Sequence, residues 1–266
     1  MILSGAREGV GGHDSLANKG EFNRKSRGER PLAERESNPL VQALVFDFDG
    51  TLVDTETPEF TVWSHIFDQH KVRMPDGYWA SMIGRGAEQE FERPAALLER
   101  LCGVPFRDSE YRHQKIMTLI DRESLRPGTE ALIMEAHAKG LPCGVASSSP
   151  HLWVDRELDK RGVLHLFDFV SCADDVKRAK PFPDLYLLAC DRLDAEPAQT
   201  VAIEDTPNGL AAAKAAGLFA VATPNPVTQS LDLSAADLRV DDLSAWSLAD
   251  LDQALVQRRE RARLSR

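Results

Sequence analysis

Short apolar runs alternate with helical patterns along most of the chain. The runs resemble strands that are buried on both faces of a sheet, and they lie at 41–48, 141–147, 167–171, 200–205 and 218–223. Between them, apolar residues recur at helical spacing, at 129–140, 151–162, 184–193 and 208–217. This alternation predicts an α/β fold with a Rossmann-like, doubly wound parallel sheet and helices on both of its faces.

One segment breaks this alternation. From about Pro58 to Arg126 the chain shows helical patterns only, which predicts an inserted, all-helical domain. Residues before and after the sheet domain lack its pattern. The expected organisation is a flexible leader at 1–39, a sheet domain at 40–56 and 127–250, the helical domain at 57–126 and a basic tail at 251–266.

Composition narrows the classes of partner and compartment. The 266 residues carry a formal net charge of −10, so the surface is expected to repel nucleic acid and anionic membranes. No apolar run reaches the roughly 20 residues that span a bilayer, and the N-terminus lacks the apolar core of a signal peptide. We therefore expect a cytoplasmic protein. Our working expectation for its assembly is a monomer or weak dimer. Its four cysteines show no C-x-x-C pairing, which favours reduced thiols over a structural zinc site.

Two terminal segments leave alternatives open. The leader either is a flexible tail or holds a segment that binds a partner. The last nine residues carry five arginines, and they form either a solvated helix end or a basic anchor for membrane or RNA.

Carboxylates stand at the ends of two predicted strands. Asp47 and Asp49 flank Phe48 at the end of the first strand, so their side chains project to the same side. Glu204 and Asp205 end the strand at 200–205. Acids at these positions either cap the following loop or helix or meet a metal ion, because buried carboxylates are costly without a cation or donors.

Hydroxyl and ammonium groups follow two other strands. Ser147 and Ser148 precede Pro150, which opens a predicted helix, and they either cap that helix or hold a phosphate oxygen. Lys180 lies between the strand predicted at 167–171 and the helix predicted at 184–193, in a segment that Pro181 and Pro183 stiffen. It is either a surface lysine or a cation at the site. Because the carboxyl ends of parallel strands meet at one edge, all these groups are expected to converge.

Four motifs in this order, DFDGTLVDTE, VASSS, KPFPD and IEDTPNG, resemble those of the haloacid dehalogenase superfamily. The resemblance covers roughly residues 41–240 and points to the branch with a helical cap, which includes sugar-phosphate phosphatases and β-phosphoglucomutase. It implies that Asp47 is a nucleophile that forms an aspartyl-phosphate and Asp49 the general acid and base. It also implies phosphate binding by Ser147, Ser148 and Lys180, and Mg²⁺ held by Asp47, the backbone carbonyl of Asp49, Asp205 and Glu204.

Asp49 of the first motif and three residues of the cap segment bear on the choice within the superfamily. The dehalogenases lack a second aspartate in the first motif, so Asp49 favours phosphoryl transfer. Two departures weaken the resemblance to the mutase. Glu59 stands where the mutase has a histidine, and the stretch that begins Gly84-Arg85 does not have the arginine of the mutase cap loop at the matching position, so that this arginine is absent or displaced. Arg85 is either a specificity residue or a surface arginine.

These observations predict a Mg²⁺-dependent phosphatase for a small phosphorylated metabolite, a sugar or polyol phosphate. The alternatives are a hexose-phosphate mutase and, from another class, a catalytically silent phosphate sensor or scaffold.

Overall fold

A parallel sheet lies at the centre of the computed structural model, which describes residues 40–83, 92–103, 105–107 and 109–264. The described residues form a six-stranded sheet in the order β3-β2-β1-β4-β5-β6. Its strands are β1 (Ala43–Phe46), β2 (Cys143–Ala146), β3 (Phe169–Ser171), β4 (Thr200–Glu204), β5 (Phe219–Ala222) and β6 (Leu238–Arg239). The five predicted strands are confirmed. The sixth was missed because two residues are too few to show a pattern.

Strand β1 lies in the middle of the sheet and pairs with β2 on one side and β4 on the other. Phe46 is level with Val145 of β2 and with Ile203 of β4. Alternate residues of β1 belong to different core clusters, with Leu44 and Phe46 in one and Ala43 and Val45 in the other. This is the arrangement that successive side chains on opposite faces require.

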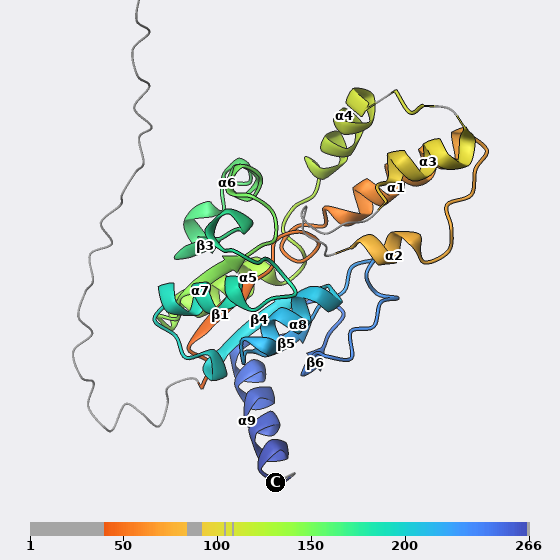
Figure 1. Cartoon of the computed structure of the whole chain (residues 1–266). Coiled ribbons are helices and arrows are strands. Elements are labelled where there is room, and N and C mark those ends of the chain that lie inside the picture. The colour runs from red at the N-terminus through yellow and green to blue at the C-terminus, as the bar shows by residue number, and fades with distance from the viewer. Residues whose placement is uncertain (1–39, 84–91, 104, 108, 265–266) are drawn as a thin grey trace, which may run out of the picture. The chain divides into compact units, whose positions relative to one another are not determined.

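Helices cover both faces of the sheet (Figure 1). The first core cluster includes side chains from α5 (Thr129–Ala138), α6 (His151–Lys160) and α9 (Leu248–Leu264). The second includes side chains from α7 (Asp184–Arg192) and α8 (Pro207–Ala215). Short 3₁₀ turns lie at Leu164–Leu166, Ala173–Asp175 and Pro197–Gln199. The doubly wound α/β fold is therefore confirmed.

The basic C-terminal segment is part of helix α9. Leu251 and Leu255 lie beyond the expected end of the sheet domain, yet both are fully buried in its core. Farther along, Arg258 donates to the Leu218 carbonyl at 3.0 Å and Arg259 to the Ala198 carbonyl at 3.0 Å. This segment thus packs against the sheet domain up to Arg259, whereas residues 260–264 are exposed.

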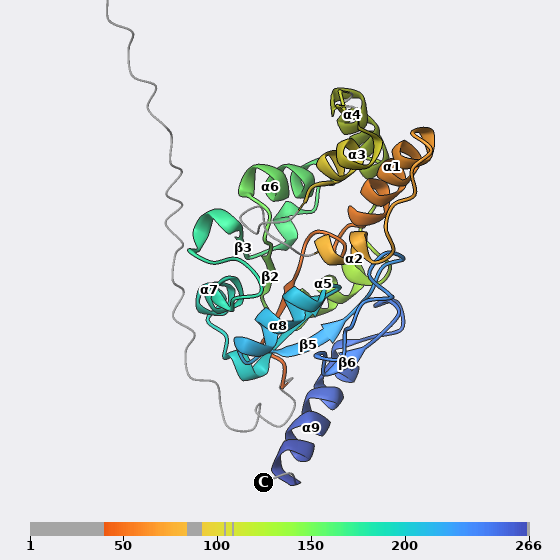
Figure 2. The same cartoon turned by 45° about the vertical axis from the view of Figure 1, so that its right-hand side comes forward.

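The inserted segment is helical in its described residues. It contains α1 (Glu56–Gln69), α2 (Tyr78–Met82), α3 (Pro94–Cys102) and α4 (Ser109–Ile120), which gather apart from the strands in Figure 1 and Figure 2. These helices have a hydrophobic cluster of their own, built around Trp63, Phe67 and Leu97. The short α2 was not predicted. We call these helices the cap.

The return from the cap to the sheet is anchored by Arg126. Its guanidinium donates to the carbonyls of Gly50, Thr223 and Pro224 at 2.9, 2.5 and 2.7 Å. Two residues later, a Cβ on Gly128 would lie 2.1 Å from the carbonyl carbon of Leu243. This linker is therefore held tightly against the sheet domain.

No helix among the described residues has the length and apolar character to cross a membrane. All four cysteines are free thiols, and Cys143, Cys172 and Cys190 are buried.

Candidate active site

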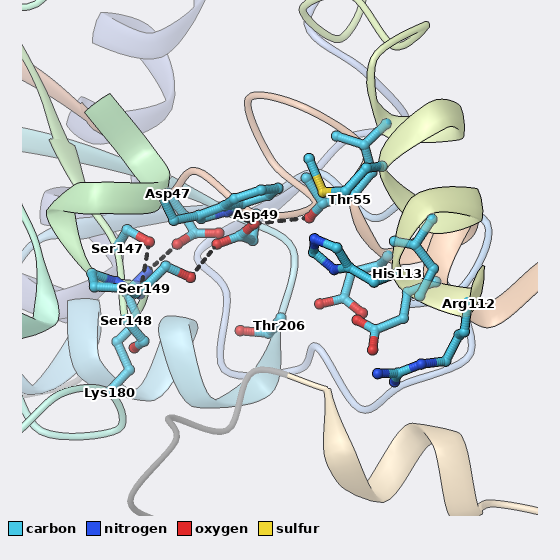
Figure 3. A pocket seen from close by; sticks show the side chains of 17 residues that line it. Asp47, Asp49, Thr55, Arg112, His113, Ser147, Ser148, Ser149, Lys180 and Thr206 are labelled. Carbon is cyan, nitrogen blue, oxygen red and sulfur yellow. Dashed lines mark hydrogen bonds and ion pairs between the residues drawn. The ribbon is translucent and has the colours of Figure 1, made fainter. Parts of the chain in front are cut away.

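Side chains from four parts of the sheet edge meet at one cavity of about 500 Å³ (Figure 3). Asp47 follows β1, Ser147 follows β2, Lys180 comes from the segment before α7, and Thr206 follows β4. The cap lines the cavity through α1 and α4. The lining residues are Asp47, Asp49, Thr55, Glu56, Glu59, Arg112, His113, Ile116, Met117, Ile120, Ser147, Ser148, Ser149, Pro150, Trp153, Lys180 and Thr206.

Three buried carboxylates lie together where Asp47 and Lys180 line the cavity, which we call its sheet end; Asp47 lines it and the other two lie behind Asp47. Carboxylate oxygens of Asp47, Glu204 and Asp205 lie within 4.8 Å of one another. Burial raises the pKa of Asp47 and of Asp205 well above the ordinary value, and the charge of Glu204 raises both further. Oxygen ligands of this kind suit a hard divalent cation such as Mg²⁺, which would also relieve the mutual repulsion. The residues present therefore fit the metal.

Lys180 joins two of these carboxylates. Its ammonium donates to Asp47 and to Glu204, the latter at 2.6 Å, and its side chain is only 4% exposed. Burial by itself lowers the pKa of Lys180, but the charges of Asp47 and Glu204 outweigh burial and raise it above the ordinary value. Lys180 is therefore a buried cation, not a surface lysine.

Glu204 is held by groups that the sequence did not single out. The Tyr186 hydroxyl donates to one carboxylate oxygen at 2.6 Å, and the Thr206 hydroxyl donates to the other at 3.3 Å. A Cβ on Gly209 of α8 would lie 1.9–2.0 Å from the Glu204 carboxylate. Glycine at 209 thus leaves the room that Glu204 occupies, which its place inside a helix gave no reason to expect.

Asp205 is fixed through both carboxylate oxygens. The Thr51 hydroxyl donates to one at 3.0 Å, and the Asn225 amide donates to the other at 2.8 Å. A Cβ on Gly50, whose φ is +83°, would lie 2.4 Å from that second oxygen. Gly50 therefore serves both the turn and the close approach of Asp205. Asn225 follows β5 and was missed.

The Asp49 side chain is bonded away from the three buried carboxylates. Its Oδ1 accepts from Thr55 Oγ1 at 3.0 Å and from Trp153 Nε1 at 2.9 Å, and its Oδ2 accepts from Ser149 Oγ at 2.6 Å. Trp153 lies in the first turn of α6. Its apolar ring carried no signal in the sequence for a polar role. Asp49 thus extends from the end of β1 and is oriented by Thr55 just before α1, by Ser149 before α6 and by Trp153 in α6.

The two predicted serines differ. Ser147 is buried and its hydroxyl accepts from the backbone N–H of Ser149 at 3.0 Å, a local bond typical of a loop before a helix. The Ser148 hydroxyl is buried and has no hydrogen-bond partner among the described residues, although Ser148 lines the cavity. An unbonded buried hydroxyl is costly, and a ligand oxygen in the cavity would satisfy it.

The cap contributes charged groups of both signs. Glu56 and Glu59 of α1 and Arg112 of α4 line the cavity. Burial raises the pKa of Glu56 and of Glu59, while the charge of Arg112 opposes the rise at Glu59. Glu59 was predicted from the sequence. The other two predicted cap residues, Gly84 and Arg85, lie outside the described residues.

Comparison with known proteins gives concordant relatives. YhcW of Bacillus subtilis (strain 168) is 38% identical over 79% of this chain and 96% of its own length. Validoxylamine A 7'-phosphate phosphatase of Streptomyces hygroscopicus subsp. limoneus is 30% identical over 77% of this chain and 95% of its own. The crystal structure of CbbY from Rhodobacter sphaeroides in complex with phosphate covers 80% of this chain and 99% of its own, with a TM-score of 0.62 and 29% identity. The model of the haloacid dehalogenase-like hydrolases matches residues 41–217, and the chain belongs to this family.

Proposed function

We propose that this hydrolase is a Mg²⁺-dependent phosphatase that acts on a small phosphorylated metabolite, a sugar or polyol phosphate. The observation that carries the proposal is the set of Asp47, Glu204 and Asp205 beside Lys180 at the sheet end of the cavity. The name of the Streptomyces relative, which describes a phosphatase, supports the same reaction. We expect the enzyme to act in the cytoplasm as a monomer or weak dimer.

The proposed reaction has two steps on Asp47. Its carboxylate attacks phosphorus, the bond from phosphorus to the ester oxygen breaks, and Asp49 gives a proton to the departing alkoxide. Asp49, now ionised, takes a proton from a water molecule that attacks the aspartyl-phosphate, which releases phosphate and restores Asp47. The hydrogen bonds from Thr55, Ser149 and Trp153 hold Asp49 in place for both transfers.

Binding of the phosphoryl group falls to residues around Asp47. Lys180 balances the charge of Asp47 and of the phosphoryl oxygens, and Ser147 and Ser148 face those oxygens from the loop before α6. When bound by Asp47, Asp205 and the Asp49 carbonyl, with Glu204 close by, Mg²⁺ supplies positive charge that lowers the repulsion between carboxylate and phosphate. The unbonded hydroxyl of Ser148 supports this assignment.

Phosphate release from sugar, polyol and nucleotide monophosphates tests the proposal. We expect release with Mg²⁺, loss with EDTA, and a loss of at least about 10³-fold in Asp47→Asn, because the nucleophile is removed. Asp68→Asn, an exposed carboxylate on α1, is the matched control and should release phosphate like the wild type. Activity retained in Asp47→Asn would refute the assignment. Isomerisation of β-glucose 1-phosphate without phosphate release would favour the mutase instead.

A further inference from the structure

We infer that the cap end of the cavity selects phosphate esters whose remaining part is uncharged and rich in hydroxyl groups, and that Glu59 and Arg112 determine this specificity. Esters with a second phosphate or a carboxylate are rejected. The inference rests on the proposed phosphatase function and adds which metabolites the cavity accepts. By the cap end we mean the cavity lining formed by Glu56, Glu59, Arg112, Ile116, Met117 and Ile120.

The cap end lies across the cavity from the phosphate-binding groups. Figure 3 shows Arg112 and His113 on one side of the pocket and Ser147, Ser148 and Lys180 on the other. A substrate whose phosphate lies beside Lys180 therefore extends toward Arg112. The cavity of about 500 Å³ falls within the roughly 300–1,000 Å³ usual for small-molecule sites, so there is room for a sugar-sized group.

Arg112 is positioned by its stacking and lacks a bond at one donor. Its guanidinium lies 4.7 Å from the centre of the Trp63 ring, on the neighbouring helix α1. Its Nε is buried and has no hydrogen-bond partner within the described residues. An acceptor on the substrate would satisfy such a donor.

The charges at the cap end disfavour a second anion. Among the described residues that line this end, two carboxyl groups, Glu56 and Glu59, face one guanidinium, that of Arg112. Arg93 also acts on Glu59 but is not among the lining residues. Even with one of these two carboxyl groups protonated, the other offsets the charge of Arg112. A second phosphate would meet repulsion here, in contrast to the sheet end, where Lys180 is present.

A hydroxyl group matches these side chains, because it both donates and accepts a hydrogen bond. It can donate to Glu59 while it accepts from Arg112, which neither a phosphate nor an ammonium group can do for both partners. Ile116, Met117 and Ile120 of α4 add an apolar wall suited to the carbon skeleton. The cap end is therefore complementary to a neutral polyol.

The test measures kcat/KM on the full chain with Mg²⁺. The substrates are fructose 1-phosphate, fructose 1,6-bisphosphate and p-nitrophenyl phosphate, which lacks hydroxyl groups. We expect kcat/KM for the monophosphate to exceed that for the bisphosphate by at least about 10-fold, since the bisphosphate carries a second anion in place of the 6-hydroxyl group. In Glu59→Gln and Arg112→Gln, the ratio of fructose 1-phosphate to p-nitrophenyl phosphate should fall about 10-fold. In Glu59→Lys, kcat/KM for the bisphosphate should rise relative to kcat/KM for the monophosphate.

Controls and contrary results are distinct. Arg107→Gln changes an exposed arginine that does not line the cavity, and it should keep the wild-type ratios. The inference would be overturned if the wild type preferred the bisphosphate, or if the ratios were unchanged in both Glu59→Gln and Arg112→Gln. In either case, hydrolysis of p-nitrophenyl phosphate would still support the phosphatase function. Failure to hydrolyse any of the three substrates would overturn both.

Discussion

The two ends of the cavity are built on opposite physical terms. At the sheet end, Lys180 is buried and bonded to two buried carboxylates, Asp47 and Glu204, which leaves these side chains little room to move. At the cap end, Glu59 and Arg112 are only half-buried, and Arg112 keeps an unbonded donor. Buried, mutually bonded groups hold the fixed geometry that a reaction needs, whereas the half-buried groups of the cap end have more room to adjust. In our proposal, chemistry belongs to the sheet domain and substrate selection to the cap.

The largest effect is expected from Lys180→Met at the sheet end. It leaves Asp47 and Glu204 buried without the ammonium that bonds both. We expect a loss of about 3–5 kcal/mol in the free energy of unfolding and at least about 100-fold in kcat. Urea denaturation and phosphate release measure the two. Lys177→Met, an exposed lysine on the same segment, is the control. A stability loss no greater than that of the control would show that the sheet end is less rigid than we infer.

Gly209→Ala tests how tightly Glu204 is enclosed. Helix propensity alone predicts that alanine stabilises α8 by up to about 1 kcal/mol. The Cβ, however, would lie 1.9–2.0 Å from the Glu204 carboxylate, so we expect a net destabilisation of about 1–3 kcal/mol and reduced activity. Thermal and urea unfolding decide by the sign of the change. A stabilised variant would mean that Glu204 has room to move.

Trp153→Phe removes one hydrogen bond from Asp49 and keeps an aromatic ring beside Phe48. We expect kcat to fall roughly 10-fold, because a hydrogen bond that orients Asp49 is lost, with little change in KM for p-nitrophenyl phosphate. Steady-state kinetics on that substrate measure both. An unchanged kcat would show that Thr55 and Ser149 suffice to hold Asp49.

The smallest effect is expected from a partly exposed ion pair between His151 and Asp175. His151 Nε2 lies 2.8 Å from Asp175, with the imidazole one-third exposed. Burial lowers its pKa, but Asp175 and Asp155 outweigh burial, and the net pKa is raised above 6.5. The contribution of this pair to the free energy of unfolding is therefore fully present below pH 6.5. It is lost as the pH rises through the raised pKa of His151.

We expect less than about 1 kcal/mol from this pair, because solvent screens it. Unfolding of the wild type and His151→Gln at pH 6 and pH 9 measures it, and their difference should shrink at pH 9. A difference that stays constant would assign the effect to packing instead.

The strands and the motif residues could be read from the sequence because both follow from local patterns. A buried strand such as β4 needs a continuous apolar run, and its last residue, Glu204, necessarily lies at the sheet edge. Parallel strands bring their ends together, so the meeting of Asp47 with Asp205 was predictable. The partners Tyr186, Asn225 and Trp153 were not, since each is distant in sequence and ordinary in type.

The sequence by itself determined the α/β fold, the helical insertion and the residue types at the strand ends, because these depend on periodicity and order along the chain. Only the tertiary structure decided that Lys180 is buried between Asp47 and Glu204, that Asp49 is held by Trp153, and that Arg112 faces the cavity. These facts depend on contacts between segments 20 to more than 100 residues apart. Such contacts arise from packing and leave no repeating pattern in the chain.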